Sequence, residues 1–281
     1  MAMRMGEHLM SLLGELRYEP VTRRVRASLD GVPVLDTTDA VLVWEPRRVV
    51  PMYAVPPGDV RADLVPCAAP DVPDQLPAVL GPVNFGWHHT PGRSFDLVVG
   101  DRALPAAGFA PHDPDLGGRV VLDWEPLHWV EEAHPVVGHP HDPFKRIDLL
   151  PSERHVVVSI DGVVLADTRR AVALHETHIP ARWYLPHDDV VTDLLVGSPS
   201  STTCAYKGHA AYVSLRPDAV PGLAGDAGHD IAWSYPHPLD EVAAIRGMFC
   251  FYSERSDLEL DGVAVPRPVT LWSSPRDQER S

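Results

Sequence analysis

A length of 281 residues allows two domains of ordinary size, each with a core of its own. The formal net charge is −15 and no basic face is visible, so nucleic acid is excluded as a partner, because its phosphate backbone would be repelled. No apolar run approaches the roughly 20 residues of a membrane helix and no signal peptide is visible, which predicts a cytoplasmic protein without a membrane partner.

Residues 1–17 are predicted to form a short amphipathic N-terminal helix. Apolar residues recur there at helical spacing: Met5, Leu9, Leu12, Leu13 and Leu16. The apolar face of this helix could dock on the first domain or cover a partner subunit. The oligomeric state stays open.

An internal repeat organises the rest of the chain. Alternating apolar residues surround Asp30-Gly31, and the same pattern returns around Asp161-Gly162, 131 residues later. Asp-Gly between two such runs predicts a β-hairpin, because both turn positions need positive φ. Further pairs at nearly the same offset are Asp36-Thr37 with Asp167-Thr168, Glu45 with Glu176, Tyr53 with Tyr184, and Glu125 with Glu254.

These pairs predict a first repeat over residues 18–133 and a second over 151–262, and both should be mainly β-strand. The 30 prolines and 20 glycines are too frequent for long helices. Strands are expected at 211–215, 231–234 and 248–252, and Cys250 should be a buried small hydrophobe on the opposite face from its neighbours Phe249 and Phe251.

Residues 134–150 and 263–281 are predicted to be a Pro/His-rich linker and a C-terminal tail. Histidines in the linker lack the regular spacing of a metal site. Three widely separated cysteines, Cys67, Cys204 and Cys250, offer neither a disulfide framework nor a four-cysteine zinc site. We therefore expect no metal and no cofactor.

The stretch Ser198–Tyr212, SPSSTTCAYKGHAAY, carries the most chemistry. Cys204 and Lys207 are three residues apart, so a tight turn would bring them to one side, and Gly208 would supply the positive φ that ends it. Lys145 and Lys207 are the chain's lysines, since every other basic residue is arginine. Lys145 falls in the predicted linker, which makes Lys207 the more interesting of the two.

Cys204, Lys207 and Glu176 are the candidate catalytic residues. A thiolate favoured by a nearby ammonium would make Cys204 a nucleophile, whereas the alternative is a buried thiol. Lys207 could anchor a carboxylate or phosphate, act as a Schiff-base amine if it is desolvated, or form a structural ion pair with Glu176 or Glu254. Glu176 could transfer protons. However, a glutamate also occurs at the equivalent position of the first repeat, Glu45, and a residue common to both repeats is better explained by a structural role.

An aromatic set accompanies this motif in the second repeat. Together with Lys207, the candidate ligand-binding residues are Tyr184, Tyr206, Trp233 and Tyr235. Aromatic side chains can wall a pocket for a small organic ligand, but in a small β domain they form the core at least as often.

Five segments of the second repeat carry a family resemblance: VVLADTRRAVALHET, YLPHDDV, TTCAYKGHAAY, IAWSYPHPLDEV and IRGMFCFY. They resemble the bacterial and fungal family known as domain of unknown function 427, over nearly all of residues 152–262, and the first repeat resembles a diverged copy. The resemblance implies a compact antiparallel β domain of the β-tent type, related in shape to Mss4-like folds. It implies no established activity.

Two departures from the family pattern concern the central motif. Ala205 stands where proline is usual, and in the first repeat His88 is opposite Cys204 while Pro91 is opposite Lys207. Whatever the thiol and the amine do in the second repeat, the first repeat cannot do in the same way.

We therefore expect a mainly β protein of two tandem β-tent-like antiparallel-sheet domains with a short N-terminal helix. The function that we infer is binding or conversion of a small, anionic metabolite in a pocket of the second repeat. The alternative is a non-catalytic scaffold that binds a peptide or protein partner. The sequence assigns neither the ligand nor a reaction.

Overall fold

A computed structural model describes residues 2–223, 225–270 and 273. The chain divides into two compact units, Met1–Asp142 and Pro143–Ser281, and each is described by itself. Within the described part of the chain, no helix is long and apolar enough to cross a membrane.

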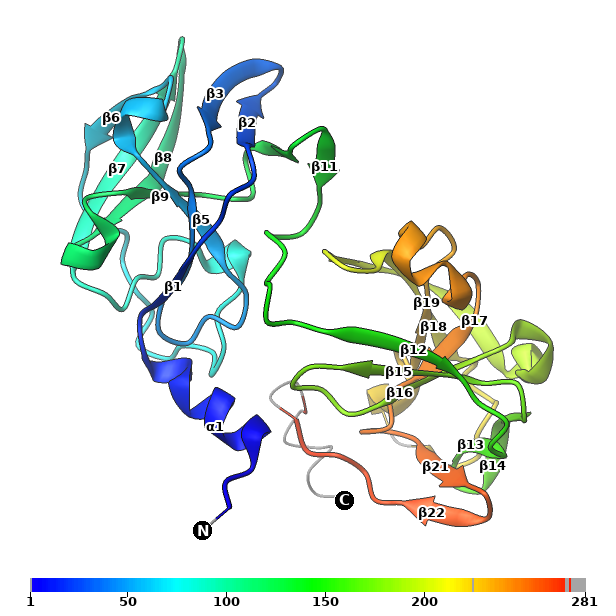
Figure 1. The fold of residues 1–281 in the computed structure, drawn as a ribbon. Coiled ribbons are helices and arrows are strands. Elements are labelled where there is room, and N and C mark those ends of the chain that lie inside the picture. The colour runs from blue at the N-terminus through cyan, green and yellow to red at the C-terminus, as the bar shows by residue number, and fades with distance from the viewer. Residues whose placement is uncertain (1, 224, 271–272, 274–281) are drawn as a thin grey trace. The chain divides into compact units, whose positions relative to one another are not determined.

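Helix α1 (Met5–Ser11) and a 3-10 turn (Leu12–Gly14) occupy the region where the N-terminal helix is predicted (Figure 1). No residue of α1 is buried, and Met5 is 64% exposed. Among the described residues 2–16, Leu16, which follows the 3-10 turn, packs against an apolar cluster of the first unit. The short N-terminal helix is confirmed, but over a shorter range than the predicted 1–17, because a strand begins at Arg17, and the apolar face of α1 is not buried.

The first unit contains two antiparallel sheets (Figure 1). The large sheet has seven strands in the order β1-β4-β5-β9-β8-β7-β6, and the small sheet has four in the order β11-β10-β2-β3. The bounds are β1 (Arg17–Pro20), β2 (Val25–Leu29), β3 (Val32–Thr37), β4 (Val41–Trp44), β5 (Met52–Val55), β6 (Asp63–Pro66), β7 (Gly92–Val99), β8 (Arg102–Pro111), β9 (Val120–Leu122), β10 (His128–Glu131) and β11 (His134–Val136).

The second unit repeats this topology. Its sheets have the orders β12-β15-β16-β20-β19-β18-β17 and β14-β13-β21-β22, so each strand of the first unit corresponds to the strand numbered eleven higher. The bounds are β12 (Ile147–Pro151), β13 (Val156–Ile160), β14 (Val163–Thr168), β15 (Val172–Glu176), β16 (Arg182–Leu185), β17 (Leu195–Cys204), β18 (Gly208–Leu215), β19 (Ala232–Ser234), β20 (Phe249–Phe251), β21 (Asp257–Leu260) and β22 (Val263–Val265). The predicted duplication is confirmed.

Short 3-10 helices fill several connections in both units. Their bounds are Pro57–Asp59, Pro82–Asn84, Pro114–Leu116, His187–Asp189, Thr192–Leu194, Gly225–Gly228 and Asp240–Ile245. None exceeds six residues, as the frequent prolines and glycines predict.

The two Asp-Gly hairpins form as predicted. The φ angles are 48° and 83° at Asp30 and Gly31, and 47° and 83° at Asp161 and Gly162. These values are typical of the two-residue turn that matches the twist of paired strands. The turns join β2 to β3 and β13 to β14.

Each unit has an inner core between its two sheets and an outer cluster on the opposite face of the large sheet. Strand β20 shows the alternation: Phe249 and Phe251 belong to the inner core, whereas Cys250, fully buried, belongs to the outer cluster, as predicted. The outer cluster of the second unit consists of Val172, Leu174, Tyr184, Ala210, Trp233, Tyr235, Val242, Ile245 and Cys250.

The predicted linker 134–150 is shorter than expected. Its first three residues form β11, which pairs with β10, and β12 begins at Ile147 and pairs with β15. Both are edge strands, where proline is tolerated because no further strand needs its missing N–H. The predicted tail likewise starts inside the β21–β22 hairpin, and its residues 271–272 and 274–281 lie outside the described residues.

The predicted equivalence of Tyr53 and Tyr184 is wrong by one position. Val43 pairs with Met52 in the first unit, whereas Leu174 pairs with Arg182 in the second, so the first connection is one residue longer. The counterpart of Tyr184 is therefore Ala54. Because strand residues alternate between faces, Tyr53 lies in the inner core and Tyr184 in the outer cluster.

Candidate functional site

The motif TTCAYKG forms the predicted turn between β17 and β18. The backbone N–H of Lys207 donates to the carbonyl oxygen of Cys204 at 3.3 Å, and Gly208 has a φ of 92°. Ala205, at the position where the resemblance implies proline, is completely buried. A Cβ at position 208 would lie 3.3 Å from the carbonyl oxygen of His237, so glycine fits both the conformation and the space.

Both lysines of the chain meet at Glu176. Lys207 Nζ lies 2.6 Å from Oε2, and Lys145 Nζ lies 2.9 Å from Oε1. The exposed fractions of the side chains are 4% for Glu176, 9% for Lys207 and 21% for Lys145. We call these three residues the Glu176 cluster. It carries two ammonium groups and one carboxylate.

Two opposing effects set the pKa of Glu176. Burial raises it, because a charged carboxylate loses its hydration. The ammonium groups of Lys207 and Lys145 outweigh that effect, and the pKa lies below its ordinary value. The carboxylate is therefore ionised at neutral pH and both of its oxygens accept hydrogen bonds from the lysines.

Lys145 is not an incidental lysine in a linker. It lies two residues before β12, and the pairing of Ile147 with Glu176 brings it over the carboxylate. Its ammonium also lies 5.8 Å from the centroid of the Tyr206 ring, within the range of a cation–π interaction. The pairing of β12 with β15 places Lys145 there. Composition does not reveal such a long-range pairing, so the sequence did not predict this contact.

Three of the candidate ligand-binding aromatics are core residues. The exposed fractions are 1% for Tyr184, 8% for Trp233 and 5% for Tyr235. Trp233 Nε1 donates to the hydroxyl of Tyr184 at 3.1 Å, and burial raises the pKa of both tyrosines. All three side chains are buried members of the outer cluster and expose little surface to a ligand.

The two cysteines of the second unit differ in accessibility. Burial raises the pKa of the Cys250 thiol to about 12, so it stays protonated at neutral pH. Cys204 is half-buried and packs against the outer cluster. The Lys207 ammonium that would favour its thiolate is bound to Glu176. Nucleophilic chemistry at Cys204 stays a prediction.

A second buried ion pair lies beside the outer cluster of the second unit. The sequence analysis did not predict it. Arg182 donates two hydrogen bonds of 2.7 Å to the carboxylate of Glu254. Its guanidinium carbon lies 5.5 Å from the Trp233 ring centroid and 5.9 Å from that of Tyr252. Strand alternation could have revealed it, because residues 182 and 184 of one strand must share a face.

An open hollow adjoins the outer cluster beside Tyr252. Its volume is about 490 Å³, and its lining consists of Ser200, Ser201, Thr202, Tyr212, His229, Asp230, Tyr252 and Arg255. The ring centroids of Tyr252 and Trp233 are 4.6 Å apart, so the buried aromatic residues of the outer cluster continue to the hollow. We call it the Tyr252 hollow. None of the candidate catalytic or ligand-binding residues lines it, although four lining residues belong to the stretch Ser198–Tyr212.

Arg255 is held at the edge of the Tyr252 hollow by backbone groups. It donates to the carbonyl oxygen of His229 at 2.7 Å and to that of Asp230, and its guanidinium carbon lies 4.5 Å from the Tyr252 ring centroid. Elsewhere in the lining, the hydroxyls of Thr202 and Tyr212 are 2.9 Å apart and share a hydrogen bond. The hollow thus combines one guanidinium, the carboxylate of Asp230, an aromatic face and several hydroxyl groups.

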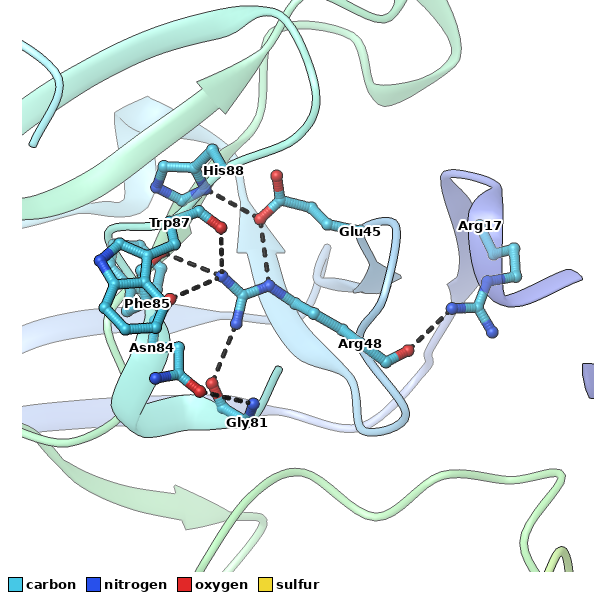
Figure 2. Close-up of polar contacts among 8 residues, drawn as sticks. All are labelled: Arg17, Glu45, Arg48, Gly81, Asn84, Phe85, Trp87 and His88. Atoms are coloured by element: carbon cyan, nitrogen blue, oxygen red, sulfur yellow. Dashed lines mark hydrogen bonds and ion pairs between the residues drawn. The ribbon is translucent and has the colours of Figure 1, made fainter. Parts of the chain in front are cut away.

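In the first unit, the glutamate at the corresponding position has different partners (Figure 2). Glu45, the counterpart of Glu176, is approached by Arg48 Nε at 3.3 Å and by His88 Nδ1 at 2.9 Å. The His88 ring stacks on Phe109 with centroids 3.6 Å apart. A buried glutamate with cationic or imidazole partners is common to both units, which favours a structural role for it.

Arg48 also fastens a loop to the first unit. Its guanidinium is 1% exposed and donates to four backbone carbonyl oxygens, those of Gly81, Asn84, Phe85 and Trp87, at 3.0 to 3.4 Å (Figure 2). We call residues 80–88 the Arg48 loop. Phe85 from this loop belongs to the outer cluster of the first unit.

Asp123, just after β9, predicts a pH dependence. Burial raises its pKa to about 6, while the unfolded chain keeps the ordinary value near 3.8. Between these values the folded state binds more protons than the unfolded state, so stability falls as the pH rises from about 4 to about 6 and then levels off. We expect urea midpoints of the first unit to show this decline in the natural chain and not in Asp123→Asn. Parallel pH profiles for the two proteins would contradict the assignment.

Comparison with known proteins gives one finding. The family model described as Domain of unknown function (DUF427) matches residues 17–69 and 148–262, which together exceed half of the chain. The match covers the second unit nearly throughout and ends just after β6 in the first. No curated protein matches the chain.

Proposed function

The chain belongs to the Domain of unknown function (DUF427) family, and we propose that its second unit binds a small, anionic metabolite in the Tyr252 hollow. One observation carries the proposal: an open hollow of about 490 Å³ lies beside the buried aromatic residues of the outer cluster, with Arg255 at its edge. That volume falls in the range of roughly 300 to 1,000 Å³ that is usual for small-molecule sites.

The lining supports a polar ligand with an apolar portion. Tyr252 offers a ring face, while the hydroxyl groups of the lining offer donors and acceptors whose positions are partly fixed by the Thr202–Tyr212 hydrogen bond. A few positioned polar groups beside an aromatic surface are typical of sites that orient a small organic molecule.

The charge of Arg255 supports an anionic ligand. The two groups that hold its guanidinium are neutral carbonyl oxygens, and no direct ion pair to it is recorded in the described part of the chain. The Glu176 cluster adds one excess positive charge to the same unit. In a chain of net charge −15, Arg255 and the two lysines are positive charges that would attract an anion, and Asp230 in the lining offsets part of that attraction.

The proposal is binding, without an assigned reaction at Lys207 or Glu176. These two side chains are less than a tenth exposed and neutralise each other at 2.6 Å. A group used for proton transfer must reach the proton that it moves, which neither can do from this position. Lys207 then acts as the structural ion-pair partner, the simplest of the roles expected for it.

The alternative, a scaffold that adds a peptide to a sheet edge, has less support. Strand β17 is the ten-residue edge of the large sheet in the second unit. Its register is irregular between Gly197 and Ser201, and Pro199 lies within that stretch. Irregularities and proline are features by which edge strands avoid further pairing.

Native mass spectrometry of the purified full-length chain tests the proposal. We expect a small acidic molecule to copurify, and Arg255→Met to lower its affinity about tenfold to a hundredfold, as loss of a charge-assisted contact implies. The matched control is Arg170→Met, because Arg170 is an exposed arginine of the same unit that pairs with Asp189, outside the hollow. Equal retention in both variants, or copurification of a peptide instead, would contradict the proposal.

A further inference from the structure

A cluster of arginines surrounds a cavity in the first unit, far in sequence from the motifs discussed above. The cavity has a volume of about 250 Å³, and its charged lining residues are Arg24, Arg26, Asp36 and Arg61, with His128 beside them. Arg26 and His128 belong to β2 and β10 of the small sheet. We call it the arginine pocket.

The arginine pocket has an excess of positive charge. Arg24 donates two hydrogen bonds of 2.7 Å to Asp36, and Arg61 donates one of 3.2 Å to the same carboxylate. Arg26 donates to the backbone carbonyl oxygen of Glu132 at 2.5 Å, while its buried Nε has no hydrogen-bond partner among the described residues. Three guanidinium groups thus line the cavity with one carboxylate.

The second unit shows that the fold does not need these basic side chains. Arg26 pairs with Val130, and in the second unit the matching pair is Val157 with Glu259. His128 pairs with Ser28, and its counterpart, paired with Ser159, is Asp257. Valine and aspartate therefore occupy these two basic positions in a sheet of the same topology.

Of the other two arginines, Arg61 shows the same contrast, whereas Arg24 is replaced by a histidine. The backbone N–H of Arg61 donates to the carbonyl oxygen of Val34. In the second unit the equivalent hydrogen bond runs from the N–H of Val191 to the carbonyl oxygen of Leu165, so valine stands in place of arginine. Arg24 corresponds to His155, which contacts Asp167 at 2.7 Å. Arg26, Arg61 and His128 are thus particular to the first unit, while the aspartate and one nitrogen-bearing partner for it are common to both.

We propose that the arginine pocket binds the phosphate group of a small molecule. Guanidinium groups present a planar fork of N–H donors that matches the oxygens of a phosphate, and several of them neutralise its two negative charges. Asp36 holds two of these forks in place. The cavity is small for a drug-sized ligand, which fits a phosphate with a short organic part.

Isothermal titration of the full-length chain at low ionic strength tests this proposal, with inorganic phosphate and phenyl phosphate as probes. We expect one site per chain, and an affinity that falls as salt is added, because partly exposed charges are screened. Tighter binding of phenyl phosphate identifies a phosphate ester as the ligand type, and tighter binding of inorganic phosphate identifies the free ion.

The decisive variant is Arg26→Val, which introduces the residue that the second unit carries at this position. It should fold for that reason, and it should bind phosphate roughly ten to a hundred times more weakly. Arg61→Val, again the natural residue of the second unit, provides a second test if the first variant fails to fold. Arg170→Val, which removes an arginine paired with Asp189, is the control and should bind normally.

Two results would overturn the proposal. One is no phosphate binding by the natural chain up to about 10 mM, since weaker binding than that corresponds to almost no specific interaction. The other is unchanged binding in both Arg26→Val and Arg61→Val. Arg26→Val and Arg61→Val leave the lining of the Tyr252 hollow unchanged, so retention of the copurifying metabolite in these variants distinguishes failure of this proposal from failure of the proposed metabolite site.

Discussion

Replacing Arg48 with methionine is expected to lower the free energy of unfolding of the first unit by about 4 kcal/mol, the usual cost of removing one partner from a buried ion pair. The guanidinium is 1% exposed, and its loss leaves four carbonyl oxygens of the Arg48 loop without their donor. His88 remains beside Glu45, so the carboxylate keeps one partner, while the loop loses its attachment (Figure 2).

Hydrogen exchange measured by mass spectrometry locates this effect. Peptides covering residues 80–88 should lose protection in Arg48→Met, while peptides of the second unit should not change. Arg102→Met is the control within the first unit, because both side chains of its ion pair with Asp30 are more than half exposed and the pair should contribute less than about 1 kcal/mol. If the two variants unfold at the same urea concentration, Arg48 does not fasten the loop.

The parts of the fold that the sequence predicts correctly depend on local chemistry. Asp30-Gly31 and Asp161-Gly162 specify their turns because few residues accept positive φ, and alternating apolar residues then assign each strand to a face. The same reasoning placed Cys250 against the outer cluster, opposite Phe249 and Phe251. The repeat in these local signals was sufficient to predict two copies of one fold.

The incorrect equivalence of Tyr53 and Tyr184 shows where such reasoning fails. An alignment with constant offset cannot see that one connection is a residue longer, and in a strand a one-residue shift moves a side chain to the other face. Tyr53 therefore donates to Glu131 from the inner core, while Tyr184 accepts from Trp233 in the outer cluster.

The candidate site was predicted only in part, for a different reason. The pairing of Glu176 with Lys207 was among the alternatives, but the arrival of Lys145 depends on β12 pairing with β15, which is a long-range contact. Aromatic residues give the same sequence pattern whether they are buried in a cluster or line a pocket. Only burial distinguishes them, and it places Tyr235 inside and Tyr252 at the hollow.

The second large effect is expected at Lys207. Changing it to methionine should lower the free energy of unfolding of the second unit by about 3 kcal/mol, because the 4% exposed Glu176 loses its closer ammonium. The loss should be smaller than at Arg48, since Lys145 still neutralises the carboxylate at 2.9 Å. Lys145→Met, at the more exposed of the two lysines, should cost less than Lys207→Met.

A double substitution separates an ion pair from other causes of instability. Because the cost comes from a buried carboxylate without its partner, Glu176→Gln combined with Lys207→Met should be more stable than Lys207→Met alone. Urea unfolding of the natural chain, both single variants and the double variant measures this coupling. A double variant as unstable as the sum of the single ones would show that Lys207 and Glu176 act independently. If Lys207→Met has the same free energy of unfolding as the natural chain, Lys207 is not a structural ion-pair partner, and the ligand-anchor role is favoured instead.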